Sequence, residues 1–329
     1  MKTKKLLLIA LFGLTLAACG DDDDPFVPQP VNNNTNQDDN NQGQGNSPTD
    51  NNNANKNATT VCAEAWRLEF PKLKGGSSIP VVHTATLNSR TGETGINYTV
   101  EWDTDIHAQR WSCYQMYESI AVSNTSRYTV TPKGSLTSDS QYPNDEFLSS
   151  QYQFTQEPYW GTGYDHGHIC PSADRLGSYE CNRQTFYLTN MQPQVNGFNA
   201  GIWEKMESQV RTWNRGSFRD TLYVVKGGTI DSDANIIKYV GSGANKIPVP
   251  KYFFMALLCK NSQGYKALGF WIQHSGNISE NDPLANYAVN IDELEEKTGI
   301  DFFCNLPDDV EDKIESLAVD NVKRAWGLK

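Results

Sequence analysis

The stretch GYDHGHICPSADR, residues 163–175, gathers two histidines, two aspartates and an arginine within thirteen positions. Histidine is otherwise scarce: the chain of 329 residues contains five, and His166 and His168 are two of them. Three interpretations are open on these residues alone: a metal-binding pair, a catalytic base with its supporting groups, or a polar turn that contains histidine by chance. The segments that follow help to decide between them.

The residues after this stretch alternate between expected secondary structure and polar junctions. Residues 163–169 are predicted to form a strand end or turn, which the small Gly167 would permit. TFYLTN (185–190) is predicted to be a strand and MQPQVNGF (191–198) a turn, and a helix follows from Asn199. One face of that helix is apolar at near-helical spacing, through Ile202, Met206, Val210 and Trp213. Polar side chains at such junctions can converge on one point in space.

These junctions carry groups suited to acid–base chemistry and to binding a hard cation. Histidine titrates near neutral pH, so His168 can act as a general base, and Asp165 could support it. Asn190 and Asn199 offer amide oxygens, which suit Mg²⁺ better than zinc. The plainer interpretation of the two asparagines is turn formation and helix N-capping, and a DxGH tetrapeptide alone is a weak signal. Only the joint spacing of these residues can indicate a function.

The remainder of the chain predicts an α+β domain with a largely antiparallel sheet. Strands outnumber helices, and strands and helices do not alternate regularly. Two further helices are expected, one over Ile291–Lys297 that ends at Gly299 and one after Pro307. The other expected strands are rich in β-branched and aromatic residues: Tyr98–Trp102, Arg110–Tyr117, Tyr128–Thr131, Leu222–Lys226, Tyr252–Leu258 and Ala267–Gln273.

Several blocks of the sequence resemble one known family. DHGHICPSADR (165–175), followed by FYLTNMQPQVNGFNAGIWEKME (186–207), is similar to the DNA/RNA non-specific endonucleases, the sugar-non-specific nucleases of the ββα-metal superfamily. Their motif is Asp-Arg-Gly-His, then Thr/Ser-Asn-x-x-Pro-Gln, then Asn-x-Gly-x-Trp and a glutamate. The three later blocks are present as Thr189–Gln194, Asn199–Trp203 and Glu207.

Further blocks extend the resemblance over about Val82–Val310. They are HTATLN (83–88), a Trp111 strand with Arg127 sixteen residues on, and DELEEKTGIDFFCNLPDDV (292–310). The resemblance implies the ββα-metal nuclease fold, an α+β fold with a largely antiparallel central sheet flanked by helices.

The resemblance also implies a role for each matching residue around a Mg²⁺ or Mn²⁺ ion. His168 matches the general base that takes a proton from the attacking water, and Asn199 matches the single direct protein ligand of the metal. Glu207 lies about two helical turns further on and would hold the waters of the ion. Asn190 would position those waters or His168, and Asp165 would support the histidine and the groups around the metal.

Two more positions concern the phosphate. Arg127 matches the family arginine that neutralises charge growing on the phosphate in the transition state. His166 stands where the family usually has arginine, so it would bind the substrate phosphate weakly and mainly when protonated. A second metal ligand at His166 is the alternative interpretation of this departure.

With these roles the chain is expected to be a Mg²⁺-dependent endonuclease that hydrolyses phosphodiester bonds of DNA and RNA and leaves 5′-phosphate ends. Two other functions stay open. One is a nucleic-acid-binding surface lipoprotein whose catalysis is weakened by the change at His166. The other is a phosphodiesterase for small nucleotides.

The first sixty residues predict export and a lipid anchor. A basic start and a short apolar run end in LAAC (16–19), which resembles a bacterial lipobox, so residues 1–19 are expected to be a signal peptide and Cys19 to carry lipid. Residues 20–60 are almost devoid of apolar side chains and are expected to be a disordered tether. The run Asp21–Asp24 resembles an acidic export tag, which favours the outer membrane, at the cell surface or its periplasmic face. Residues 61–329 would then form one domain.

Cysteine count and charge add two constraints. The even number of cysteines after Cys19 favours disulfides in an exported protein, and Cys170 with Cys181 is the pair expected to hold the loop after His168. The formal net charge is −11, of which about −8 falls on residues 61–329. Such a domain does not adhere to nucleic acid through a basic surface, but a bound cation can supply positive charge at its site.

Overall fold

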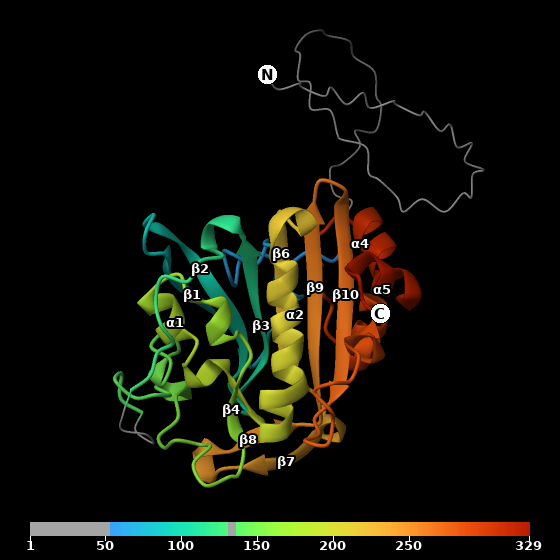
Figure 1. Cartoon of the computed structure of the whole chain (residues 1–329). Coiled ribbons are helices and arrows are strands. Elements are labelled where there is room, and N and C mark those ends of the chain that lie inside the picture. Colours follow the sequence, from blue (N-terminus) through green and yellow to red (C-terminus); the bar gives the residue numbers. More distant parts are fainter. Residues whose placement is uncertain (1–52, 131–135) are drawn as a thin grey trace, which may run out of the picture. The chain divides into compact units, whose positions relative to one another are not determined.

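The central sheet contains seven strands in a computed structural model that describes residues 53–130 and 136–329. Every neighbouring pair in this sheet is antiparallel. In spatial order the strands are β1 (Ser78–Asn88), β2 (Glu93–Asp103), β3 (Ala108–Tyr117), β6 (Thr221–Gly228), β9 (Tyr252–Asn261), β10 (Gly264–Gln273) and β11 (Ala288–Val289) (Figure 1). The predicted signal peptide, Cys19 and the run Asp21–Asp24 lie outside the described residues.

The middle of the sheet is apolar on both faces, which explains why its strands have nearly continuous apolar sequences. Successive side chains of a strand point to opposite faces. In β9, residues 253, 255, 257 and 259 belong to a first core, and residues 254, 256 and 258 belong to a second core on the other face. In β6, Leu222 and Val224 belong to the first core. Lys226 has the same parity, so this fully buried lysine faces the first core too.

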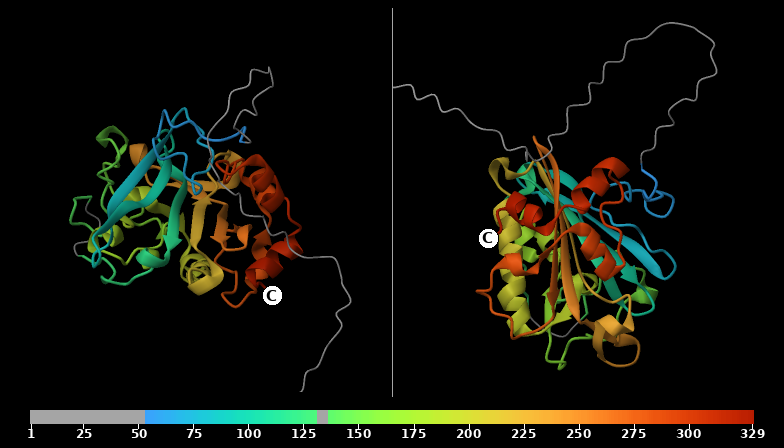
Figure 2. Two further views of the ribbon diagram at one scale, coloured as in Figure 1. Left: turned by 90° about the horizontal axis from the view of Figure 1, so that it is seen from above. Right: turned by 90° about the vertical axis from the view of Figure 1, so that its right-hand side faces the viewer.

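Helices cover the first face of the sheet through a stripe of large side chains. α2 (Glu204–Trp213) packs Met206, Val210 and Trp213 into the first core, and it runs alongside the middle strands of the sheet (Figures 1 and 2). α5 (Val319–Trp326) lies next to it, and the rings of Trp213 and Trp326 have centroids 4.8 Å apart. The helices α2 and α5 together therefore cover the first face of the sheet.

The second face is covered by α3 (Ile291–Thr298) and α4 (Asp308–Glu315), which bury Ile291, Leu294 and Ile314 in the second core. The Asn290 side chain accepts a hydrogen bond from Glu293 N and caps the start of α3. Gly299 ends this helix in the left-handed conformation, at φ 70°. The predicted α+β architecture, with an antiparallel sheet flanked by helices, is confirmed.

Two short antiparallel ribbons complete the fold. β4 (Asp165–His168) pairs with β5 (Met191–Gln194), and β7 (Ile236–Val240) pairs with β8 (Ile247–Pro250). Of the predicted strand end or turn, the strand is present, and Gly167 lies within it. A Cβ atom at this position would come within 2.4 Å of the Gln194 side chain, so close packing between the two strands explains the glycine.

One predicted strand is wrong, and it lies next to the site. TFYLTN (185–190) starts in a turn after α1 (Tyr179–Gln184) and ends in a 3₁₀ turn over Leu188–Asn190. Local hydrogen bonds from Tyr187 N to Gln184 O (3.1 Å) and from Asn190 N to Tyr187 O (2.9 Å) close these turns. The strand β5 begins only at Met191, where a turn was expected. Burial in the core, and not membership of a sheet, accounts for the apolar character of the segment.

The other expected elements are present, except that residues 128–130 are not a strand and Thr131 lies outside the described residues. The strands β1, β7, β8 and β11 and the helices α1 and α5 were not predicted. No helix within residues 53–130 and 136–329 has both the length and the apolar character that crossing a bilayer requires.

The predicted disulfide between Cys170 and Cys181 is wrong. Cys170 is a free thiol in the first core, whereas Cys181 packs with Ala85 and Leu87 in a separate small cluster. The Cys181 thiol donates a hydrogen bond to Thr86 O at 3.1 Å. The other cysteines after Cys19 are also buried free thiols: Cys62, Cys113, Cys259 and Cys304.

Residues 53–60, which were assigned to the tether, are bonded to later parts of the chain. Asn55 Nδ2 donates to Glu311 Oε1 at 2.9 Å, and Asn57 Nδ2 donates to Pro71 O at 3.0 Å. The folded part of the chain therefore includes these residues.

Candidate active site

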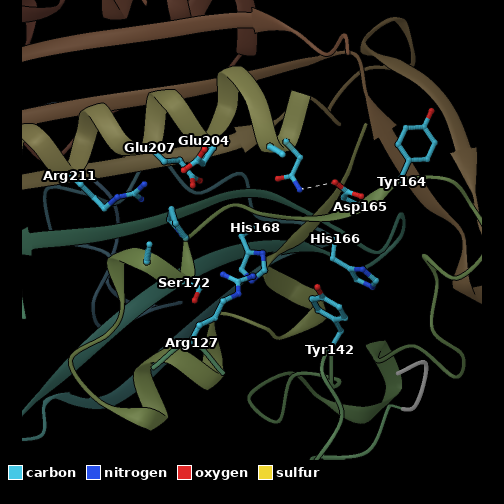
Figure 3. A pocket seen from close by; sticks show the side chains of 14 residues that line it. Arg127, Tyr142, Tyr164, Asp165, His166, His168, Ser172, Glu204, Glu207 and Arg211 are labelled. Carbon is cyan, nitrogen blue, oxygen red and sulfur yellow. Dashed lines mark hydrogen bonds between the residues drawn. The ribbon is translucent and has the colours of Figure 1, made fainter. Parts of the chain in front are cut away.

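A cavity of about 460 Å³ opens between β4 and the start of α2 (Figure 3). Its wall comes from β4 and the loop after it, from the π-helical turn η5 (Phe198–Trp203) with α2, and from the segments that carry Arg127 and Tyr142. Asn190 is the predicted site residue that does not line this cavity. The other six do: Arg127, Asp165, His166, His168, Asn199 and Glu207.

His168, the last residue of β4, is held by its backbone while its imidazole keeps one nitrogen unpaired. Trp203 Nε1 donates to His168 O at 3.3 Å, and the Phe186 ring meets the imidazole edge-on at a centroid distance of 4.7 Å. No group among the described residues hydrogen-bonds the buried Nε2 atom of His168. Burial, and then the positive charge of Arg127, lower the pKa of His168 to about 3. The imidazole is therefore neutral at physiological pH and can accept a proton.

Asn190 fixes the backbone that follows His168. Its Nδ2 donates to the carbonyl oxygens of Cys170 and Thr185, both at 2.8 Å. Its Oδ1 accepts from Cys170 N at 2.9 Å and from Ser112 Oγ at 3.1 Å. Because Asn190 is fully buried, these bonds are shielded from water. Of the two predicted roles, this geometry suits the positioning of His168 and does not suit contact with metal-bound waters.

Asp165 and Asn199 meet at the cavity from β4 and η5. Asn199 Nδ2 donates to Asp165 Oδ2 at 3.0 Å, which is the dashed line at Asp165 in Figure 3. Asn196 Nδ2 donates to the same oxygen at 2.9 Å. The first bond directs the amide nitrogen of Asn199 to Asp165 and leaves the amide oxygen for another partner. Carboxylate and amide oxygens are ligands that Mg²⁺ accepts, so this donor set fits a hard cation. In this geometry Asp165 orients the predicted metal ligand.

The segment that carries Asn199 is irregular and is held by His274. Val195 N donates to His274 Nε2 at 2.8 Å, while His274 Nδ1 donates to Pro250 O, also at 2.8 Å. Asn199 follows in η5, where Gly201 has non-helical dihedrals (φ −112°, ψ −111°) before α2 begins. Such π-helical turns occur frequently at functional sites. His274, for which the sequence suggested no function, therefore positions the turn that presents Asn199.

Glu207 brings a carboxylate onto the otherwise apolar stripe of α2. Its Oε1 lies 3.4 Å from Nζ of Lys226, the buried lysine of β6. Burial raises the pKa of Glu207 to about 7, although the charge of Lys226 opposes the rise. Glu204, the first residue of α2, also lines the cavity and was not predicted. A lysine inside the apolar run TLYVVKGG (221–228) was the sequence signal that could have indicated Lys226.

Two arginines bring positive charge to the cavity. Arg127 is exposed, its guanidinium carbon lies 4.7 Å from the centroid of the Phe186 ring, and it stands beside His168 (Figure 3). Arg211 was not predicted, although its spacing of four from Glu207 puts both on one side of α2. Arg211 pairs with Asp174 Oδ1 at 3.0 Å, and the hydroxyl of Tyr114 donates to the other oxygen of Asp174 at 2.8 Å. The guanidinium of Arg211 is thus held at the cavity wall.

His166 is packed into an aromatic stack. Its ring is parallel to that of Tyr142, with centroids 3.6 Å apart, and stacks on Tyr159 at 4.2 Å. His166 Nε2 is hydrogen-bonded to Glu157 Oε1 at 2.8 Å. Nε2 therefore already has a partner, and a phosphate contact by His166 would have to use Nδ1 or displace Glu157. Neither tyrosine nor the glutamate was anticipated, because nothing in the sequence pattern links them to residue 166.

Proteins of similar sequence are nucleases by name. The chain is 34% identical over 193 residues to a nuclease of Nostoc sp., covering 56% of this chain and 66% of that protein. It is 31% identical over 179 residues to a nuclease of Syncephalastrum racemosum, covering 51% of this chain and 55% of that protein. Human mitochondrial endonuclease G is 28% identical over 170 residues, with 50% of this chain and 57% of that protein covered. The matched region thus spans little more than half the length of the last two relatives.

The fold has a counterpart among solved structures. The crystal structure of an EndoG/EndoGI complex matches with a TM-score of 0.55 at 21% identity, covering 70% of this chain and 89% of that chain. This likeness confirms the ββα-metal nuclease fold. The family model for the DNA/RNA non-specific endonucleases matches residues 85–309, a range that includes all seven predicted site residues. Because this match spans more than half of the sequence, the chain belongs to the DNA/RNA non-specific endonuclease family.

Proposed function

We propose that this protein is a Mg²⁺-dependent endonuclease, also served by Mn²⁺, that hydrolyses the phosphodiester bonds of DNA and RNA. The observation that carries the proposal is the convergence, in one cavity, of a neutral imidazole at His168, whose Nε2 atom no described group hydrogen-bonds, with the oxygen groups of Asn199 and Glu207. Attack of water on a phosphodiester needs a base and a cation site close together. Membership of the family, whose relatives are named nucleases, supports the proposal.

In the proposed reaction each residue has a separate task. His168 Nε2 takes a proton from water as the water oxygen bonds to phosphorus; the P–O3′ bond breaks and leaves a 5′-phosphate. Asn199 would hold Mg²⁺ directly and Glu207 would hold it through water. The bound ion supplies positive charge for the departing 3′-oxygen. Arg127 neutralises charge on the phosphate oxygens. Because these groups contact the phosphate and not the base edges, little sequence preference is expected.

Replacing His168 with alanine should remove the base and lower kcat by about 10²–10⁴-fold. The assay is cleavage of supercoiled plasmid and total RNA with Mg²⁺, and EDTA should stop the reaction. His107→Asn is the matched control, since His107 lies outside the cavity in a left-handed backbone conformation (φ 51°) that asparagine tolerates. Circular dichroism establishes that each variant is folded.

The same assay separates the competing functions. Full activity in His168→Ala would rule out this residue as the base. Binding of DNA without Mg²⁺-stimulated cleavage would indicate a nucleic-acid-binding protein. Cleavage of a small model diester with intact plasmid would indicate a phosphodiesterase for small nucleotides.

Proton competition at Glu207 gives a second prediction. Metal binding requires the ionised carboxylate, and burial raises the pKa of Glu207 to about 7. Below pH 7 each bound Mg²⁺ must displace one proton, so the apparent affinity should fall up to about tenfold per pH unit. Above pH 7 the contribution of Glu207 should be constant. Calorimetric titration with Mg²⁺ at pH 6, 7 and 8 measures this dependence.

Glu207→Gln is the control for this titration, because the amide has nearly the same shape but does not titrate. It should bind Mg²⁺ more weakly than the wild type and with a flatter dependence on pH. Equal affinities of the wild type at pH 6 and pH 8 would contradict the assignment of Glu207.

A second cavity supports action on long substrates. It measures about 340 Å³ and adjoins the first, because Ala173 and Arg211 line both. The exposed Arg215, two residues after the end of α2, also lines it. An endonuclease must hold the strand on both sides of the bond that it cuts. In the proposed mode the strand continues from the catalytic cavity over Ala173 towards Arg215.

Arg215→Ala is therefore expected to raise KM several-fold for an oligonucleotide of about 20 nucleotides and to leave a small diester unaffected. Arg90→Ala removes the same charge at an exposed position away from both cavities and controls for general attraction of polyanions. Steady-state kinetics on both substrates measure the effect. Equal changes for Arg215→Ala and Arg90→Ala would contradict the proposed path.

We further propose that the protein is a lipoprotein of the outer membrane, anchored through Cys19 and facing the exterior or the periplasm. The lipobox-like LAAC (16–19) supports this, although these residues lie outside the described ranges. Mass spectrometry of the mature protein should find lipid on Cys19, and Cys19→Ser should release the protein from membranes. An unmodified Cys19 in the mature chain would refute the anchor.

A further inference from the structure

A group of three carboxylates joins α3 to α4 on the second face of the sheet, and none of the three lines the catalytic cavity. Asp292 and Glu295 lie three positions apart on α3 and so share one side of that helix, while Glu315 is the last residue of α4. One carboxylate oxygen from each residue lies within 4.8 Å of the other two. This arrangement brings three groups of like charge together.

Glu315 is the buried member of this cluster, and one of its carboxylate oxygens has no hydrogen-bond partner among the described residues. Its residue surface is 4% exposed, and no described group hydrogen-bonds its Oε1. A buried and unpaired carboxylate oxygen costs free energy of folding unless a cation or a proton compensates it. Asp292, by contrast, is exposed, so the cluster reaches solvent at one side. An ion could enter from that side.

The surroundings of the cluster add further negative charge. Burial raises the pKa of Glu315 to about 10, and the neighbouring Glu295, Glu311, Asp292 and Asp301 raise it further. Burial also raises the pKa of Glu295 to about 8, partly opposed by a hydrogen bond from Phe302 N to Glu295 Oε1 at 2.6 Å. Asn55 Nδ2 binds Glu311 at 2.9 Å and Asp301 at 3.2 Å, but it carries no charge. Repulsion between carboxylates this close is relieved either by a bound cation or by protonation.

We propose that Asp292, Glu295 and Glu315 form a second, structural cation site that binds Ca²⁺ and ties α3 to α4. The ligands are carboxylate oxygens only, which disfavours softer metals that prefer nitrogen or sulfur. Ca²⁺ accepts flexible sets of carboxylates and water, whereas Mg²⁺ demands near-ideal octahedral geometry and usually keeps several waters. The site is separate from Asn199 and Glu207, and its occupancy affects the stability of the second core rather than the chemistry of hydrolysis.

The test is thermal unfolding of the full chain, stripped with EDTA and then measured with and without millimolar CaCl₂. Asn199→Ala is included because it weakens the catalytic metal site, so a response to Ca²⁺ in this variant must come from elsewhere. Ca²⁺ should raise Tm in the wild type and in Asn199→Ala to similar extents. In Glu315→Gln and in Asp292→Asn the shift should be lost or greatly reduced, while both variants keep plasmid cleavage in Mg²⁺.

Asp292→Asn is included in case Glu315→Gln impairs folding. Asp292 is exposed, so its replacement should leave the fold intact. Calorimetric titration of Asn199→Ala with CaCl₂ should give one site, and adding Asp292→Asn to it should abolish that site. An equal Tm shift in Asn199→Ala with and without Asp292→Asn would overturn the proposal. So would the absence of any Ca²⁺ response in Asn199→Ala, in which case protons neutralise the cluster.

Discussion

The hydrogen bond from Asn199 Nδ2 to Asp165 Oδ2 joins two segments 34 residues apart, and the geometry of the cavity depends on it. Asp165 belongs to β4, which β5 holds in antiparallel register, whereas Asn199 belongs to a π-helical turn that is anchored through Val195 and His274. The bond also decides which atom of the Asn199 amide remains for a cation. The bonds from Asn196 Nδ2 to Asp165 Oδ2 and from Trp203 Nε1 to His168 O join the same two parts of the site and support it.

The same low-polarity surroundings act in opposite directions on the two titrating groups of the cavity. Burial disfavours the charged form of each group. The charged form of His168 is protonated, so its pKa falls, whereas the charged form of Glu207 is deprotonated, so its pKa rises. The first effect keeps a base available at physiological pH. The second leaves Glu207 partly protonated near neutral pH, so that a cation competes with the proton there, and the buried charge of Lys226 limits the rise of the pKa. Lys226 is tolerated in the first core because it faces this carboxylate.

The sequence indicates the site residues well where one local segment determines their position. The motif around His168 and the apolar stripe of α2 predict the strand end and the helix, and the resemblance to the family adds the six side chains that meet at the cavity. The strands β6, β9 and β10 were also predictable, because burial on both faces gives them continuous apolar runs. What local patterns reveal is therefore the identity of the chemical groups and the elements that carry them.

What could not be predicted depends on partners distant in the sequence. Asn190 makes bonds to Ser112 and Cys170, so its structural role is visible only in the folded chain. TFYLTN (185–190) has the composition of a strand but is bent by local turns and buried by packing. Cys170 and Cys181 lie eleven positions apart, yet the fold puts them in different cores. Composition cannot distinguish such outcomes, because tertiary packing overrides local propensity.

The central claim is that the His168 imidazole accepts the proton of the attacking water. Chemical rescue tests it most directly: plasmid cleavage by His168→Ala is measured in Mg²⁺ with increasing imidazole, beside Asn199→Ala. Imidazole is expected to restore part of the activity of His168→Ala, in proportion to the concentration of its neutral form, and none of the activity of Asn199→Ala. Equal rescue of both variants, or full activity of His168→Ala without imidazole, would contradict the claim.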